Sequence, residues 1–139
     1  MEKVPHFKII ILEDDDFYNG LLSRFVHAVM KELSLEKRFT YELQAYTTYS
    51  DCSPNVDATT SLVIADYYLD TGGTPSHLIH LMEKRPSECK VVIMSRQKDA
   101  KKELESLLKG TYEFFQKDTT LFNNCRDMIF SIVMLENEN

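Results

Sequence analysis

Three short apolar runs stand out along the sequence, and each stops abruptly at a polar or charged residue. They are KIIIL at 8–12, LVIA at 62–65 and VVIM at 91–94. Each run is too short for a buried helix and too continuous for a strand with one solvated face. Such runs are typical of strands that are buried on both faces of a parallel sheet. The sequence therefore predicts three central strands of one sheet.

Two further segments predict strands with less burial. Between residues 39 and 45 apolar side chains alternate with polar ones, which is typical of a strand with one solvated face. We expect this strand at an edge of the sheet. Residues 112–115 hold a short aromatic run that leads into Lys117, and they predict the last strand.

Apolar residues at helical spacing fill most of the intervals between these strands. They predict helices over 17–33, 75–84, 99–109 and 121–133. The interval 49–60 is polar and contains a proline, so it is either a short helix or a loop. The last five residues, LENEN, are expected to be frayed.

Residues with special roles at helix ends set the expected boundaries. Asp15 or Asp16 can cap the first helix, and Thr74 followed by Pro75 is a typical start for the second. Arg85 with Pro86 should end the second helix, and Gly110 should stop the third.

The alternation of strands and helices predicts an α/β fold. Each parallel crossover needs a connection long enough for a helix, so five strands alternating with helices indicate a doubly wound (βα)5 parallel sheet. A chain of 139 residues fits one domain, here 1–139 with a core from about 7 to 135. We expect no output domain.

Charge and cysteine content exclude several classes of function. The net charge of −6 and pI of about 5.2 make nucleic acid a poor partner. The apolar run near the N-terminus is too short for a signal peptide or a membrane span, so we expect a cytoplasmic protein without membrane contact. The three cysteines lack CxxC spacing, which argues against both disulfides and a zinc site.

Chemically useful side chains follow the predicted strands. Glu13 with Asp14, then Asp66, Ser95 and Lys117 each come where a strand ends. One parallel sheet would bring all of them to its C-terminal edge, where ligands bind in open α/β folds. Clustered carboxylates suit Mg²⁺, and a carboxylate nucleophile with a cation, a lysine and a hydroxyl can accept a phosphoryl group. The expected acceptor is Asp66.

With these residues in place, the sequence resembles the receiver domain of two-component response regulators. The resemblance covers nearly the whole chain, through KIIILEDD at 8–15, LVIADYYLD at 62–70, VVIMSRQKD at 91–99 and LLKGTYEFFQK at 107–117. It implies a flavodoxin-like, CheY-like fold and a protein that is not an enzyme but a phosphorylatable switch.

The resemblance also implies a role for each site residue. Glu13, Asp14, Asp66 and the backbone carbonyl of Tyr68 match the ligands of Mg²⁺. Asp66 matches the phospho-acceptor, and Lys117 and Ser95 match groups that contact the phosphoryl group. The switch pair would be Ser95 and the aromatic side chain of Phe114.

Partners follow from the same resemblance. A histidine kinase or a histidine phosphotransfer protein would donate the phosphoryl group. A downstream protein would bind the face formed by the fourth helix, fifth strand and fifth helix. The receiver itself would be a monomer or a weak dimer.

The sequence departs from the family pattern at several positions. Asp118 replaces the usual proline after the lysine, so we expect a rearranged loop there. The loop 70–74 lacks the usual proline and Asp-Gly pair. Tyr68 and Arg96 are large where small residues are common, and we expect them to slow loss of the phosphoryl group. The segment 34–61 is longer than the family needs.

Two other classes of function stay open. A pseudo-receiver would keep the fold and act only by protein contact. A cofactor-binding or phosphatase enzyme of the same shape is disfavoured, because the acidic EDDD at 13–16 would repel a flavin phosphate and no GxGxxG or GxxxxGK[ST] motif is present. Phosphatases of the haloacid dehalogenase type also need an acid at the position of Tyr68.

Overall fold

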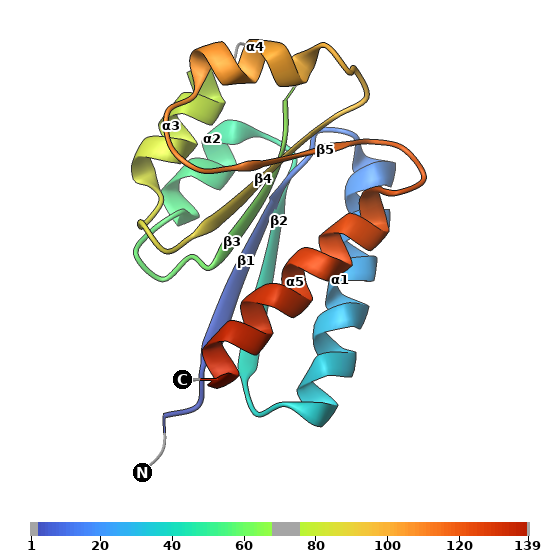
Figure 1. Cartoon of the computed structure of the whole chain (residues 1–139), viewed down its shortest axis with the longest axis vertical. Coiled ribbons are helices and arrows are strands. Elements are labelled where there is room, and N and C mark those ends of the chain that lie inside the picture. Colours follow the sequence, from blue (N-terminus) through green and yellow to red (C-terminus); the bar gives the residue numbers. More distant parts are fainter. Residues whose placement is uncertain (1–2, 68–75, 139) are drawn as a thin grey trace.

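A computed structural model of the chain describes residues 3–67 and 76–138. Within these residues, five strands and five α-helices alternate along the chain (Figure 1). The strands are β1 His6–Leu12, β2 Thr40–Tyr46, β3 Leu62–Asp66, β4 Lys90–Ser95 and β5 Glu113–Gln116. The helices are α1 Asp16–Glu36, α2 Tyr49–Cys52, α3 Ser76–Lys84, α4 Ala100–Leu107 and α5 Leu121–Glu138, and a 3-10 turn, Ser53–Asn55, follows α2.

All five strands are parallel, in the order β2-β1-β3-β4-β5, which confirms the predicted doubly wound sheet. The strand with alternating polarity, β2, lies at one edge as expected, and β5 lies at the other. From β1 the chain first winds outward to β2 and then returns to add β3 on the opposite side. This reversal between β1 and β3 is the kind of switch point where α/β folds bind ligands.

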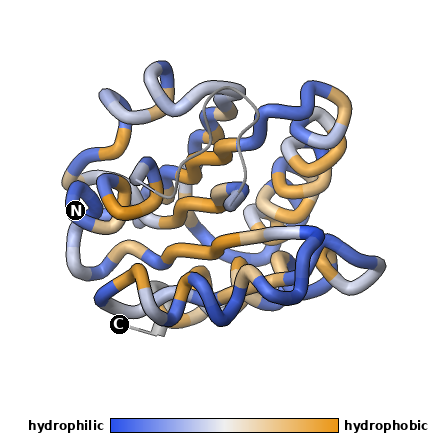
Figure 2. Tube along the Cα trace, turned by 90° about the horizontal axis from the view of Figure 1, so that it is seen from above, coloured by the Kyte–Doolittle hydropathy of each residue, from blue (hydrophilic) through white to orange (hydrophobic). Residues whose placement is uncertain are grey.

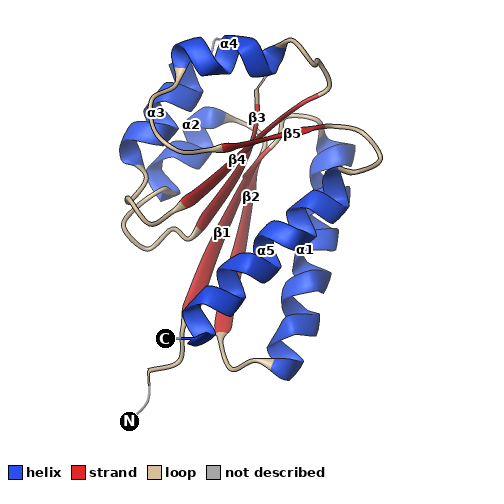
Figure 3. Ribbon diagram, viewed as in Figure 1, coloured by secondary structure: helices blue, strands red, loops and turns tan. Residues whose placement is uncertain are grey.

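Helices cover both faces of the sheet. Figure 3 shows α1 and α5 side by side on one face and α2, α3 and α4 on the other. Alternate residues of β1 supply the two cores: Phe7, Ile9 and Ile11 pack toward α1 and α5, and Ile10 and Leu12 pack toward the other helices. Seen from above, the apolar strands form the central layer between the helices (Figure 2). The continuous apolar runs of the sequence are explained by this burial on both sides.

A buried lysine interrupts the second of these cores at the start of β1. Lys8 is 5% exposed, and its Nζ donates to Oδ2 of Asp57 at 3.1 Å. Asp57 also accepts from the backbone N–H of Thr59 at 2.8 Å and from its hydroxyl at 2.5 Å. These bonds from Thr59, and then the one from Lys8, lower the pKa of Asp57 to about 2.

Two helix boundaries were predicted correctly. Asp15 caps α1, because its side chain accepts from the N–H of Tyr18 at 2.9 Å. The second predicted helix, α3, ends at Lys84, directly before Arg85 and Pro86. The expected cap of α3 at Thr74 and Pro75, and the loop 70–74, lie outside the described residues.

Two boundaries were predicted wrongly. Helix α4 ends at Leu107 instead of Lys109, because Leu108 turns to extended geometry and buries its side chain in the core. Gly110 therefore does not stop the helix directly, although it has a φ of 101°. At the C-terminus α5 continues to Glu138 where fraying was expected, since Leu and Glu favour helix. The undecided segment 49–60 contains the short helix α2 and the 3-10 turn.

Candidate functional site

A pocket of about 430 Å³ lies at the C-terminal edge of the sheet, where the ends of β1, β3, β4 and β5 meet. It brings together five residues that the sequence analysis singled out for chemistry: Glu13, Asp14, Asp66, Ser95 and Lys117. Asp15, Arg96 and Gln97 also line it. The predicted convergence of these strand-end residues is therefore present in the fold.

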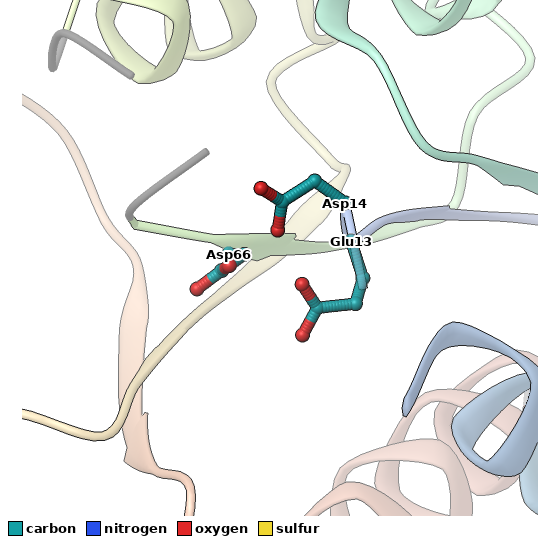
Figure 4. Close-up of side chains that lie close together, drawn as sticks. All are labelled: Glu13, Asp14 and Asp66. Atoms are coloured by element: carbon teal, nitrogen blue, oxygen red, sulfur yellow. The ribbon is translucent and has the colours of Figure 1, made fainter. Parts of the chain in front are cut away.

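Three carboxylates in this pocket lie close enough to bind one ion. Glu13 and Asp14 come from the end of β1 and Asp66 from the end of β3, and Figure 4 shows the three side chains near one another. One oxygen from each lies within 4.8 Å of the others. Carboxylate oxygens are the hard ligands that Mg²⁺ prefers, so this donor set fits that ion. The fourth predicted ligand, the carbonyl of Tyr68, lies outside the described residues.

Lys117 supplies a buried positive charge in the site. Its ammonium group is bonded to Glu13 Oε1 and lies 3.3 Å from Oδ1 of Asp66. All three side chains are nearly inaccessible to water, since Lys117 and Asp66 are each 7% exposed and Glu13 is fully buried. One buried lysine thus faces two buried acids.

Burial of these acids alters their protonation. It raises the pKa of Glu13 from 4.5 to about 8, although the hydrogen bond from Lys117 acts in the opposite direction. Burial also raises the pKa of Asp66, again opposed by the charge of Lys117. The charge of Asp66 raises the pKa of Glu13, and that of Asp14 raises the pKa of Asp66, because like charges in one site repel. A divalent cation would relieve this repulsion.

The turn after β1 is held by a residue that the sequence analysis missed. Asn19 is buried in α1, and its Nδ2 donates to the backbone oxygens of Glu13 at 2.9 Å and of Tyr46 at 3.0 Å. These bonds fix the end of β1 against the end of β2 and so place Glu13. The available signal was an amide side chain one turn before Leu22, on the apolar side of the helix.

Ser95 lies at the end of β4, beside Lys117. Its backbone oxygen accepts from the N–H of Lys117 at 2.8 Å, so the two residues are fixed relative to each other. The side chain is 1% exposed and its Oγ accepts from the N–H of Gln97 at 3.1 Å. Among the residues that the structure describes, no group accepts from this hydroxyl, so it can donate to a ligand.

Comparison with known proteins gives a likeness in structure alone. No known protein family matches the sequence, and no curated protein is recognisably similar to it. The structure is similar to the crystal structure of a response regulator from Colwellia psychrerythraea, with a TM-score of 0.63 at 13% sequence identity. The similarity covers 91% of this chain and 96% of that chain. The fold is receiver-like and flavodoxin-like.

Within this receiver-like fold, the two predicted switch residues lie in different surroundings. Ser95 lines the pocket, whereas Phe114 is half-buried on β5 and packs against the core beneath α3 and α4. Among the described residues, Phe114 does not belong to the pocket lining. A reorientation of Phe114 stays a prediction.

The structure also shows where two departures from the receiver pattern lie, Arg96 and Asp118. Arg96 is exposed and lines the pocket, so a large cationic side chain does stand at its entrance. No cis peptide bond occurs among the described residues, which makes the bond between Lys117 and Asp118 trans. Asp118 accepts from the N–H of Thr120 at 2.8 Å at the start of the turn that leads to α5.

Two contacts behind Asp66 were not foreseen from the sequence. The buried His77 of α3 donates from Nε2 to the backbone oxygen of Asp66 at 3.2 Å. The next residue, Tyr67, extends its hydroxyl to Glu103 of α4. The end of β3 is therefore attached to two of the three helices on that face of the sheet, α3 and α4. No described helix is long and apolar enough to cross a membrane.

Proposed function

We propose that this chain is a response regulator receiver that accepts a phosphoryl group on Asp66. The observation that supports it most is the arrangement around that carboxylate: Lys117 Nζ at 3.3 Å, and oxygens of Glu13 and Asp14 within 4.8 Å, in one open pocket. Phosphoryl transfer depends mainly on positioning and on neutralising charge, and these residues provide both.

The residues would divide the work as follows. An oxygen of Asp66 attacks the phosphorus of a phosphohistidine, the P–N bond breaks, and the imidazole leaves with a proton. Lys117 and the hydroxyl of Ser95 donate to the oxygens of the transferred group. Glu13, Asp14, Asp66 and the carbonyl of Tyr68 would hold Mg²⁺, which neutralises charge on the phosphoryl oxygens.

The product is a modified receiver, so the chain acts as a switch that accepts one phosphoryl group and stays modified until water hydrolyses the acyl phosphate, which releases inorganic phosphate and restores Asp66. A histidine kinase or phosphotransfer protein would be the donor, in the cytoplasm. The receiver, a monomer or weak dimer, would pass the signal to another protein through the face of α4, β5 and α5. The net charge of −6 argues against a nucleic acid target.

A protein-binding module without phosphorylation is the second candidate. It is favoured by the direct ion pair between Glu13 and Lys117, because both side chains would have to exchange partners before a metal and a phosphoryl group could bind. In such a module the pair would serve only to neutralise buried charge.

Mass spectrometry of the intact protein separates the two candidates. The chain is incubated with phosphoramidate and Mg²⁺, beside an Asp66→Asn variant and a sample with EDTA. The receiver function predicts the addition of one phosphoryl group to the wild type alone. A wild type that stays unmodified and also fails to bind beryllofluoride would overturn it in favour of the binding module.

A further inference from the structure

The ammonium group of Lys117 has an aromatic neighbour in addition to its two acids. The ring of Tyr18, in the first turn of α1, lies beneath it with Nζ 4.7 Å from the ring centroid. This distance is within the range of cation–π attraction, which is strongest where water is excluded. The side chain of Lys117 is 7% exposed, so the contact lies in such a place.

Under the proposed function, the three neighbours of Lys117 have different fates. Glu13 and Asp66 would turn toward a cation, and Asp66 would also carry the phosphoryl group. Their bonds to the ammonium group must therefore weaken or exchange during the cycle. The ring of Tyr18 offers no ligand atom for Mg²⁺ and no donor for a phosphoryl group, so its contact with Lys117 can persist throughout the cycle.

We infer that Tyr18 is a positioning residue, whose ring keeps the ammonium group of Lys117 directed into the pocket when the acids change partners. This inference rests on the proposed function for its role in phosphoryl binding. The contact between the ring and the ammonium group, in contrast, can be tested in the free protein.

The surroundings of Tyr18 are suited to holding a ring in place. Its backbone N–H is bonded to the cap residue Asp15, which fixes the start of α1. Its ring packs at a tilt against Phe122 of α5 with centroids 6.2 Å apart, and Phe122 in turn stacks on Phe25 at 4.9 Å. Burial raises the pKa of Tyr18 to about 12, which keeps the phenol neutral.

The role of the ring can be separated from that of the hydroxyl and of general packing. Tyr18→Phe keeps the aromatic face, and Tyr18→Leu removes it while filling much of the space. Phe25→Leu is the matched control, because Phe25 belongs to the same aromatic contact between α1 and α5 but stacks on Phe122. All three variants would shift the aromatic packing between α1 and α5. Only Tyr18→Leu removes the aromatic ring beneath Lys117.

The first measurement is NMR of the Lys117 side chain in the free protein without metal, assigned with a Lys117→Met variant. The ring current of Tyr18 should displace its terminal methylene and ammonium protons upfield from those of exposed lysines. This displacement should persist in Tyr18→Phe and Phe25→Leu and be lost in Tyr18→Leu. Its absence from the wild type would overturn the inference without the use of any variant.

The second measurement is the dissociation constant of beryllofluoride with Mg²⁺, followed by ¹⁹F NMR. Tyr18→Leu should weaken binding by roughly 2- to 30-fold, the range expected for one cation–π contact, and Tyr18→Phe should restore it. Equal affinity in Tyr18→Leu and wild type would overturn the role of Tyr18 and leave the proposed function standing. If the wild type binds no beryllofluoride and also takes up no phosphoryl group, the proposed function fails and the role inferred for Tyr18 in phosphoryl binding fails with it, while the NMR result still decides the contact.

Discussion

The hydroxyl of Tyr67 donates a hydrogen bond of 2.5 Å to the carboxylate of Glu103, and so links the residue after Asp66 to helix α4. Tyr67 is 2% exposed, and its backbone N–H is bonded to Met94 on the neighbouring strand at 2.9 Å. Both the backbone and the side chain of Tyr67 are therefore held by hydrogen bonds. This side chain therefore connects the end of β3 to α4.

Removing this hydroxyl should loosen α4. We expect Tyr67→Phe to lower the free energy of unfolding by about 1 kcal/mol, since one hydrogen bond to a charged but exposed group is lost. Amide hydrogen exchange should increase in α4 more than in α1. Glu105→Gln, at an exposed acid on the same helix, is the control. Equal exchange in Tyr67→Phe and wild type would show that the bond does not hold α4.

Loss of Lys117 should leave a buried charge without its cation. At pH 9, where the fully buried Glu13 is ionised, Lys117→Met is expected to destabilise the fold by about 3 kcal/mol or more in EDTA. The raised pKa of Glu13 means that its ionised form is disfavoured in the fold, so this loss should grow as pH rises from 6 to 9. Urea unfolding at both pH values measures it.

The double variant Lys117→Met with Glu13→Gln tests the cause. It removes both charges and should recover part of the lost stability at pH 9. A double variant as unstable as Lys117→Met alone would mean that the packing of the lysine stem, and not the ion pair, stabilises the fold.

Near the start of β1, Asp57 should give the opposite pH dependence, in which stability is lost as pH falls. The pKa of Asp57 is lowered to about 2, from an ordinary value of 3.8, chiefly by Thr59. A carboxyl with a depressed pKa stabilises the fold above its unfolded pKa and loses that effect as pH falls through the folded value. Asp57→Asn should therefore be less stable than wild type at pH 5, and the difference should shrink as pH falls from 4 toward 2. Urea titrations at these pH values measure it, and a difference that stays constant would contradict the assignment.

Addition of Mg²⁺ should stabilise the protein through its acidic cluster. At a tenfold excess over Kd, one site adds about 1.4 kcal/mol, or roughly 5 °C in Tm for a chain of this size. Asp14→Asn should lose most of this shift. Asp16→Asn should keep it, because Asp16 lies in the first turn of α1, outside the cluster. Thermal unfolding with and without EDTA makes the comparison, and an equal loss in both variants would indicate diffuse screening.

A test of Arg96 addresses how long the phosphoryl group would remain. Arg96 is exposed and lines the pocket, where we expect its side chain to restrict the approach of water. Arg96→Ala should speed loss of the phosphoryl group by roughly fivefold, which corresponds to a change of about 1 kcal/mol in the barrier. Lys98→Ala removes an exposed cation nearby as the control. The lifetime of the phosphorylated form is measured from the intact mass over time. Equal lifetimes for Arg96→Ala and wild type would exclude this role.

The sheet and the main site residues could be predicted because both depend on local patterns. Apolar runs identify buried strands, and the carboxyl ends of parallel strands meet at one edge, so Asp66 and Lys117 were expected to converge. The ring of Tyr18 beneath Lys117 depends on how α1 is rotated against the loop after β5, which no local pattern specifies. The end of α4 was missed for a similar reason, since burial of Leu108 overrides the propensity of the residues around it.

Glu13 and Lys117 are separated by 104 positions in the chain, although their side chains are in direct contact. The first strand and the loop after the last strand must therefore both be in place before the pocket exists. Partly folded forms that lack β5 would expose an acidic cluster with no lysine. Occupancy of the pocket and completion of folding are consequently linked equilibria, and a ligand bound there resists global unfolding of the chain as a whole.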